Sequence, residues 1–154
     1  DASTTGHLVL STLHTNNAPE TIIRLLDMGI DPFSFADSLL CVLAQRLVRA
    51  LCRECKEPYH PGADEISELA HHYGERAFAQ LNVPSAGLTL YRPKGCAACD
   101  QSGYKGRMGI HELLTGTDEM KRLIQKHARI EEMRALAMEQ GMTTLLQDGI
   151  QKSI

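Results

Sequence analysis

Tryptophan is absent from this 154-residue sequence, and aromatic residues of all kinds make up only 5% of it. Proteins that bind single-stranded nucleic acid stack bases on aromatic side chains, so the sequence offers little material for such a platform. A formal net charge of -3 also argues against a protein that must neutralise many phosphates. We therefore expect no nucleic acid among its partners. No run of 18 apolar residues is present, so we also expect no membrane-spanning helix.

Two further absences concern targeting and catalysis. The first residues, from Asp1 to His7, lack the initiator methionine, basic region and apolar region of a secretory signal. No segment has the G-x-x-x-x-G-K-[ST] spacing of a phosphate-binding loop, and no arrangement of Ser/His/Asp or Cys/His nucleophiles stands out. Because the chain opens only a few residues before an apolar segment, we expect it to be a piece of a longer protein.

The overall composition, 43% hydrophobic and 23% charged, is ordinary for a folded domain. Residues 7–14 are rich in apolar and β-branched residues, which is typical of a strand buried on both faces in an α/β sheet. Asn17 is a suitable N-cap for a short helix over 18–28, and Gly29 follows its expected end. Apolar residues from 36 to 51 recur at helical spacing and predict a second helix of about five turns.

The middle of the chain has a different composition. Residues 52–107 hold four of the five cysteines and four of the six prolines. We expect loops and turns there, with one helical stretch over about 64–81. Residues 108–114 alternate loosely and predict a strand. Thr117 is placed to cap a helix after that strand, and the apolar spacing beyond it predicts two further helices.

Four cysteines form two C-x-x-C pairs, Cys52 with Cys55 and Cys96 with Cys99. A two-residue gap lets both thiolates of a pair face one ion, and two pairs complete the tetrahedral all-sulfur set of a structural zinc site. The pairs are 40 residues apart, more than in a short zinc ribbon, so we expect them to bracket an insert. Gly95 and Gly103 supply the tight turns that such a site requires.

Two other states of these cysteines compete with zinc. Disulfides suit a secreted chain, but no signal is visible and the cysteine count is odd. Free buried thiols are the second alternative, and a redox C-x-x-C ordinarily occurs once, at the start of a helix. The spacing favours structural zinc. We interpret the fifth cysteine, Cys41, as a small core residue of the predicted helix.

The histidines indicate no second metal site. His7 and His14 lie at the two ends of the predicted strand, and their separation of seven residues puts them on opposite faces. Each is by itself more typical of a hydrogen-bonded residue at a strand end than of a catalytic group. His71 and His72 lie on a polar helical stretch, where we expect them to be solvated.

Three segments, in order along the chain, resemble one known family. Residues 5–16, TGHLVLSTLHTN, closely resemble the histidine box of the ATPases of type II secretion and type IV pilus assembly. Residues 45–56, QRLVRALCRECK, resemble the next segment of that family. Residues 95–112, GCAACDQSGYKGRMGIHE, resemble the segment after it. The resemblance covers most of the chain and is weakest at residues 60–90 and after 115.

This resemblance implies the C-terminal part of a RecA-like P-loop ATPase domain, an α/β and helix-dominated fold with an inserted tetracysteine zinc subdomain. Such proteins are hexamers that use ATP and Mg²⁺ to drive the addition of pilin or pseudopilin subunits. Their partners are inner-membrane platform and adaptor proteins, and they are cytoplasmic, peripheral to the inner membrane. The family's phosphate loop and acidic magnesium boxes precede the histidine box. The parent protein is therefore expected to be an ATPase, and this piece alone to be inactive.

The resemblance also assigns roles to individual residues. It places His7 and His14 near the phosphates of the nucleotide, where they sense the γ-phosphate or relay its loss to a neighbouring subunit. Arg46, Arg49 and Arg107 match family positions, but solvated or salt-bridging roles stay open for them. The four cysteines match the zinc subdomain of the secretion and pilus-extension branches. Pilus-retraction members are expected to lack that subdomain.

The resulting domain division has three parts. Residues 1–51 form a portion of the RecA-like core with the histidine-box strand and two helices, residues 52–107 form the zinc subdomain, and residues 108–154 form a C-terminal strand and helices. The competing hypothesis is a stand-alone protein-interaction module stabilised by structural zinc. A phosphate loop encoded upstream in the same reading frame distinguishes the motor from the module.

Overall fold

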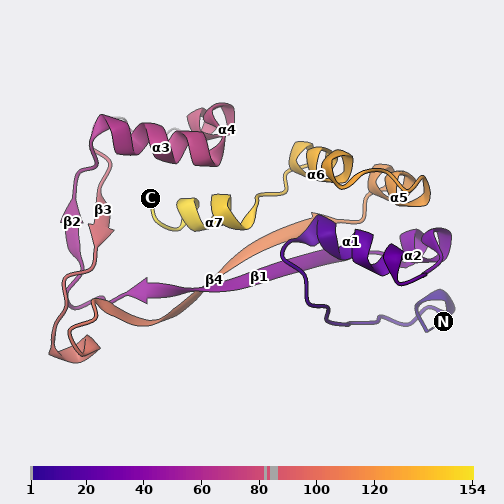
Figure 1. Cartoon of the computed structure of the whole chain (residues 1–154), viewed down its shortest axis with the longest axis horizontal. Helices are drawn as coiled ribbons and strands as arrows, with labels where there is room; N and C mark the ends of the chain where they lie inside the picture. Colours follow the sequence, from indigo (N-terminus) through magenta and orange to yellow (C-terminus); the bar gives the residue numbers. More distant parts are fainter. Residues whose placement is uncertain (1, 82, 84–86) are drawn as a thin grey trace. The chain divides into compact units, whose positions relative to one another are not determined.

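The computed structural model describes residues 2–81, 83 and 87–154. The chain divides into two compact units. Unit 1 comprises residues 1–45 and 111–144, and unit 2 comprises residues 46–110 and 145–154. Each unit therefore combines segments that are far apart in the sequence. The described residues hold seven α-helices and two two-stranded sheets (Figure 1), which confirms the expected helix-dominated α/β class.

One of the two sheets joins distant parts of the chain. Strands β1 (Cys41–Leu51) and β4 (Tyr104–Thr115) are hydrogen-bonded to each other (Figure 1). One end of each strand belongs to unit 1 and the other end to unit 2. The sheet therefore contributes side chains to unit 1 at one end and leads into the cysteine-bearing loops of unit 2 at the other.

Unit 1 has one apolar core. Its helices are α1 (Ala18–Asp27), α2 (Pro32–Ser38), α5 (Asp118–Gln125) and α6 (Ile130–Glu139). Helix α2 packs against α5, α1 packs against α6, and α5 packs against α6. Ala44 of β1 and Leu114 of β4 lie in the same core. Its fully buried side chains include Ile22, Leu114, Met120, Ile124 and Met133.

Two helix starts in unit 1 confirm the expected caps. The Glu20 N–H donates to Asn17 Oδ1 at 2.9 Å, so Asn17 is the N-cap of α1. The Met120 N–H donates to Thr117 Oγ1 at 3.2 Å, so Thr117 caps α5. These local hydrogen bonds satisfy amides that the helix itself leaves without a partner.

Unit 2 contains a short two-stranded sheet and three helices. Strands β2 (Glu57–Tyr59) and β3 (Leu90–Arg92) pair antiparallel, with Glu57 opposite Arg92. The helices are α3 (Ala63–Tyr73), α4 (Glu75–Gln80) and α7 (Leu145–Gln151). Figure 1 shows α7 beside α3, and Gln147 Nε2 of α7 donates to the Tyr73 carbonyl at 2.7 Å. This hydrogen bond connects α7 to α3, although the two helices are far apart in the sequence.

The predicted strand over residues 7–14 is wrong. A single 3-10 turn, η1 (Ser3–Thr5), precedes this segment, which has no regular secondary structure. Leu8 is 74% exposed and Leu10 is 88% exposed. An apolar, β-branched segment becomes a strand only beside a strand that completes its hydrogen bonds. Neither sheet among the described residues includes this segment.

The predicted helix over residues 36–51 is also wrong. Helix α2 ends at Ser38, and residues 41–51 form strand β1. Its first residues alternate between exposed and covered positions, and Ala44 is buried. The spacing of apolar residues in a leucine-rich stretch is compatible with a helix or with a strand. Pairing with the distant β4 makes this stretch a strand. Cys41 is consequently exposed on β1 and is not a core residue.

The remaining predicted elements are confirmed, two of them with different bounds. The helical stretch over 64–81 is divided into α3 and α4 at Gly74, whose φ of 95° interrupts the helix. The strand predicted over 108–114 is confirmed and extends further, from Tyr104 to Thr115. The two helices expected after Thr117 and its helix are confirmed as α6 and α7.

Replacing Thr117 tests the cap of α5. Thr117→Ala removes the acceptor for the Met120 N–H and the donor to Gln140 Oε1, which lies at 2.9 Å. We expect a loss of about 1 kcal/mol in the free energy of unfolding, measured by chemical denaturation. Thr117→Ser keeps the hydroxyl and is the matched control. Equal losses in the two variants would show that the hydroxyl does not contribute as a cap.

Candidate metal centre and histidine segment

The sulfur atoms of four cysteines converge in unit 2. These residues are Cys52, Cys55, Cys96 and Cys99, and all four sulfur atoms lie within 4.8 Å of one another. The individual Sγ–Sγ distances are 3.9 Å for Cys52 to Cys96, 3.8 Å for Cys55 to Cys99 and 3.7 Å for Cys96 to Cys99. The structure thus brings together the two C-x-x-C pairs singled out in the sequence, although 40 residues separate them.

These distances match the geometry of a four-sulfur metal centre. Four thiolates at about 2.3 Å from a tetrahedral ion lie about 3.8 Å from one another. A disulfide requires a separation of about 2.05 Å, and the four cysteines are free. The cluster is also sheltered from solvent, since Cys52 is 1% and Cys99 is 5% exposed. The four sulfur donors and their geometry therefore fit a closed site for one metal ion.

Backbone hydrogen bonds shape the two turns that present the sulfur atoms. The Cys52 carbonyl accepts from the Cys55 N–H at 3.3 Å and the Lys56 N–H at 2.9 Å, and the Cys96 carbonyl accepts from the Cys99 N–H at 3.2 Å. The Cys52 N–H donates to the Gly103 carbonyl at 2.9 Å. This last bond joins the two turns directly and holds one pair against the other.

Two glycines allow the second turn to close. Gly103 has a φ of 76°, and a Cβ there would lie 2.5 Å from Pro93 Cβ. Gly95 has a φ of 108°, and a Cβ there would lie 2.7 Å from the Gln101 carbonyl oxygen. Both positions combine a left-handed backbone with a close approach, so only glycine fits them. This confirms the tight turns expected at Gly95 and Gly103.

Three of these thiols, those of Cys55, Cys96 and Cys99, differ in acidity. Burial raises the pKa of Cys55 above its ordinary value and that of Cys96 to about 12. Burial also acts to raise the pKa of Cys99, but backbone N–H groups of Cys96 and Gly103, each 3.3 Å from its sulfur, lower it to about 6. A cation among these sulfurs favours the thiolate form of each. Of these three cysteines, Cys99 is the one that the protein itself most readily supplies as a thiolate.

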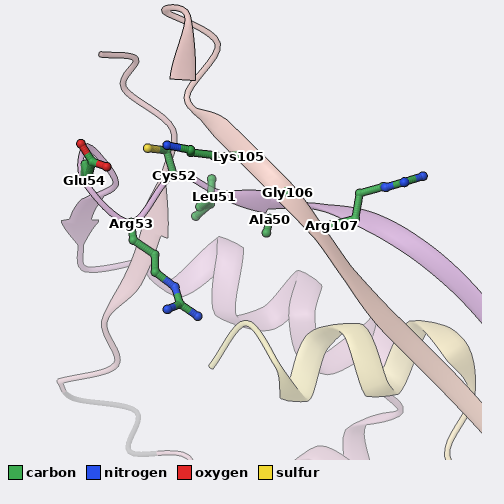
Figure 2. Close-up of a pocket in the computed structure, with 8 residues that line it drawn as sticks. All are labelled: Ala50, Leu51, Cys52, Arg53, Glu54, Lys105, Gly106 and Arg107. Carbon is green, nitrogen blue, oxygen red and sulfur yellow. The ribbon is translucent and has the colours of Figure 1, made fainter. Parts of the chain in front are cut away.

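An open pocket of about 390 Å³ adjoins Cys52. Its lining includes Arg53, Glu54, Lys105 and Arg107 (Figure 2). The side chains of Arg53 and Arg107 point in different directions (Figure 2), so their charges do not converge on one position. The pocket therefore presents basic side chains around its rim and lacks the arrangement of a dedicated anion site.

The family-matched arginines occupy different settings. The Arg49 guanidinium lies 4.1 Å from the centroid of the Tyr104 ring, a cation–π contact between β1 and β4. Arg107 lines the pocket, and Arg46 is exposed on β1. Sequence reasoning did not identify the tyrosine partner of Arg49, because the pair depends on the register of two distant strands.

The two histidines of the N-terminal segment belong to unit 1, whereas the cysteines belong to unit 2. His7 and His14 are both exposed. His7 Nδ1 lies 3.1 Å from the Thr5 hydroxyl. Because the segment is not a regular strand, the two histidines do not lie on opposite faces of a strand as predicted. His71 and His72 are exposed, as expected.

Sequence reasoning missed a buried carboxylate in unit 1. Glu112 of β4 is 4% exposed, and its Oε1 accepts from the Ala18 N–H at 2.8 Å. A charged residue between apolar ones in the strand sequence IHELL was the available signal. Its interpretation required knowledge of what lies opposite the strand, namely the first residue of α1.

Comparison with known proteins identifies related sequences. A family model described as type II/IV secretion system protein matches residues 1–154. The chain is 49% identical over 152 residues to the type II secretion system protein E of Pseudomonas aeruginosa, which covers 98% of this chain and 28% of that protein. It is 40% identical over 154 residues to the type IV pilus assembly ATPase PilB of Thermus thermophilus, covering 100% of this chain and 16% of that protein.

A third relative is the type II secretion system ATPase E of Vibrio cholerae. It is 49% identical over 127 residues, which cover 82% of this chain and 23% of that protein. The chain thus spans less than a third of the length of each of these three relatives.

Substitution of Gly103 tests how the cysteine cluster closes. Gly103→Ala places a Cβ against Pro93, so it adds a clash to the cost of a left-handed alanine. Gly106→Ala is the matched control, because Gly106 has a φ of 83° and open space at its Cβ. We expect Gly106→Ala to cost about 1–2 kcal/mol of unfolding free energy and Gly103→Ala to cost at least about 1 kcal/mol more.

The same two variants are compared with a thiol reagent. Only Gly103→Ala is expected to speed the labelling of the buried cysteines, because only that clash forces the second turn to open. Equal labelling rates and equal stabilities in both variants would contradict the steric role of Gly103.

Proposed function

Because this chain belongs to the type II/IV secretion system protein family, we propose that it is the C-terminal part of the motor domain of a hexameric, RecA-like ATPase. ATP hydrolysis by the parent protein drives the assembly of pilin or pseudopilin subunits. The observation that carries this proposal is the match of the family model over residues 1–154. A stand-alone interaction module does not account for a match of that extent.

The chemistry is divided between this chain and the rest of the parent protein. Phosphoryl transfer depends on backbone amides and a lysine that cradle the phosphates, and on carboxylates that hold Mg²⁺. No phosphate-loop sequence lies within these 154 residues, so the parent supplies it from elsewhere. His14, and with it His7, faces the nucleotide phosphates in the assembled motor. Exposure of both histidines leaves them accessible to such a ligand.

The four clustered cysteines hold one structural zinc ion. Four thiolates leave no open coordination position, so the ion supplies no catalytic water and serves to fold the protein. The zinc ion links the turn at residues 52–56 to the turn at residues 96–103. The support for this role is the convergence of all four sulfur atoms within 4.8 Å of one another, with three of the separations at 3.7–3.9 Å, in a sheltered site.

The proposed working environment follows from the family. Relatives carry the names type II secretion system protein E and type IV pilus assembly ATPase PilB. By analogy, the parent is a cytoplasmic protein that assembles on inner-membrane platform and adaptor proteins. Among the described residues, no helix combines the length and apolar character needed to cross a bilayer.

Metal analysis of the 154-residue chain tests the cysteine site. We expect about one zinc ion per chain, as one closed tetrahedral site requires. Cys52→Ser and Cys99→Ser are expected to lose the ion, whereas Cys41→Ser is expected to retain it, because Cys41 lies outside the cluster. Elemental analysis of unchelated protein provides the measurement. Protein without zinc, or equal loss in Cys41→Ser, would overturn this assignment.

The proposed ATPase is tested in the natural, longer protein. We expect ATP turnover by that protein and none by the 154-residue chain, because the chain lacks the phosphate loop. His14→Ala is expected to lower kcat by about tenfold, since it removes a group that stabilises or senses the transferred phosphoryl group. His71→Ala, at an exposed position of α3, is the control and should leave kcat unchanged. Robust turnover by the 154-residue chain would refute the proposed division of labour.

A further inference from the structure

The buried carboxylate of Glu112 holds the first residue of helix α1. Glu112 Oε1 accepts from the Ala18 N–H at 2.8 Å, although 94 positions separate the two residues. Burial of a carboxylate is unfavourable unless hydrogen bonds stabilise it, and a bond from a backbone amide to an ionised oxygen is among the stronger ones. Its location is also favourable because the N-terminus of a helix carries partial positive charge.

The protein itself occupies the amides of the first turn of α1. Ala18 donates to Glu112, Pro19 has no N–H, and Glu20 donates to Asn17 Oδ1. A helix N-terminus with free amides is a common place for a phosphate. Here the amide of the first residue is used to fasten the helix to β4. Glu112 thus fixes where α1 begins.

The segment just before α1 is bonded to that helix. The Thr15 and Thr21 hydroxyl oxygens are 2.6 Å apart. The Asn16 N–H donates to Glu20 Oε2 at 3.1 Å, and Asn16 Nδ2 donates to Glu20 Oε1 at 3.4 Å. The two residues that follow His14 therefore move with the first turns of α1. His14, which is exposed on a segment without regular secondary structure, is in this way connected to helix α1.

We propose that Glu112 is a positioning residue for His14. Hydrogen bonds connect β4 to His14 in two steps. Glu112 of β4 is bonded to the start of α1, and α1 is bonded to Thr15 and Asn16. These two residues directly follow His14. This inference rests on the proposed function, in which His14 faces the nucleotide phosphates. Glu112 itself touches no nucleotide in this scheme and acts only through the histidine segment.

Steady-state ATP hydrolysis by the natural, longer protein provides the test. Glu112→Ala is expected to lower kcat by about tenfold, because small misplacements of a reacting group have effects of that order or larger. KM for ATP should change by less than about twofold, since the contact made in the transition state is lost and ground-state binding is not. Glu112→Gln retains an oxygen acceptor for the Ala18 N–H and should recover most of kcat.

A double variant distinguishes positioning from general destabilisation. If Glu112 acts through His14, Glu112→Ala should lower kcat no further in a His14→Ala background. Thr117→Ala, which removes the cap of α5 in the same unit, is the control and should leave kcat unchanged in the folded protein. Additive effects of Glu112→Ala and His14→Ala would overturn the inference.

A second variant covers the case in which Glu112→Ala does not fold. Thr21→Val preserves side-chain shape and removes the contact with the Thr15 hydroxyl further along the same path. It should also lower kcat, by at least about threefold, and its effect should not add to the effect of His14→Ala. Normal kcat in the folded Thr21→Val and Glu112→Gln variants, together with failure of Glu112→Ala to fold, would assign Glu112 a purely structural role and overturn the inference.

Failure of the inference is separable from failure of the proposed function. An unchanged kcat in His14→Ala would overturn the role proposed for His14, and the positioning role of Glu112 with it. A low kcat in His14→Ala beside a normal kcat in folded Glu112→Ala would overturn the positioning role alone. Absence of ATP turnover in the unaltered natural protein would refute the ATPase proposal before any variant is compared.

Discussion

The pairing of β1 with β4 brings together two segments that the rest of the chain separates, and most of the features described above depend on it. In unit 2 it leads to the bond between the Cys52 N–H and the Gly103 carbonyl, which joins the two cysteine turns. In unit 1 it contributes Ala44 and Leu114 to the core. It also presents Glu112 to the start of α1. The two paired strands thus contribute residues to each of the two units.

The two candidate sites are built in different ways. The cysteine cluster is made of backbone turns, with glycine at the two positions where a Cβ would clash, so its geometry depends on the backbone of those turns. The histidine segment has no regular secondary structure, and the two residues that follow His14 are bonded to α1. A structural metal centre requires a closed, rigid donor set. The role proposed for His14 requires exposure combined with a defined point of attachment, and His14 is exposed beside residues that are bonded to α1.

Much of the local structure could be predicted from the sequence. Asn17 and Thr117 cap helices because an N-cap needs only a side-chain oxygen at a fixed offset from the helix amides. The C-x-x-C spacing identified the residues that converge in the cluster. The two failures, at residues 7–14 and 36–51, share one cause. Strand formation depends on a partner strand, and apolar spacing within a segment carries no information about that partner.

The sequence by itself therefore determined which cysteines form the cluster, where several helices begin, and to which family the chain is related. These properties reside in short spacings and in residue identity. Only the tertiary structure decided that residues 41–51 are a strand, that Cys41 lies outside the core, and that Glu112 meets Ala18. Each of these depends on contacts between residues far apart in the chain. The free energy of such contacts exceeds the weak local preferences that a sequence pattern expresses.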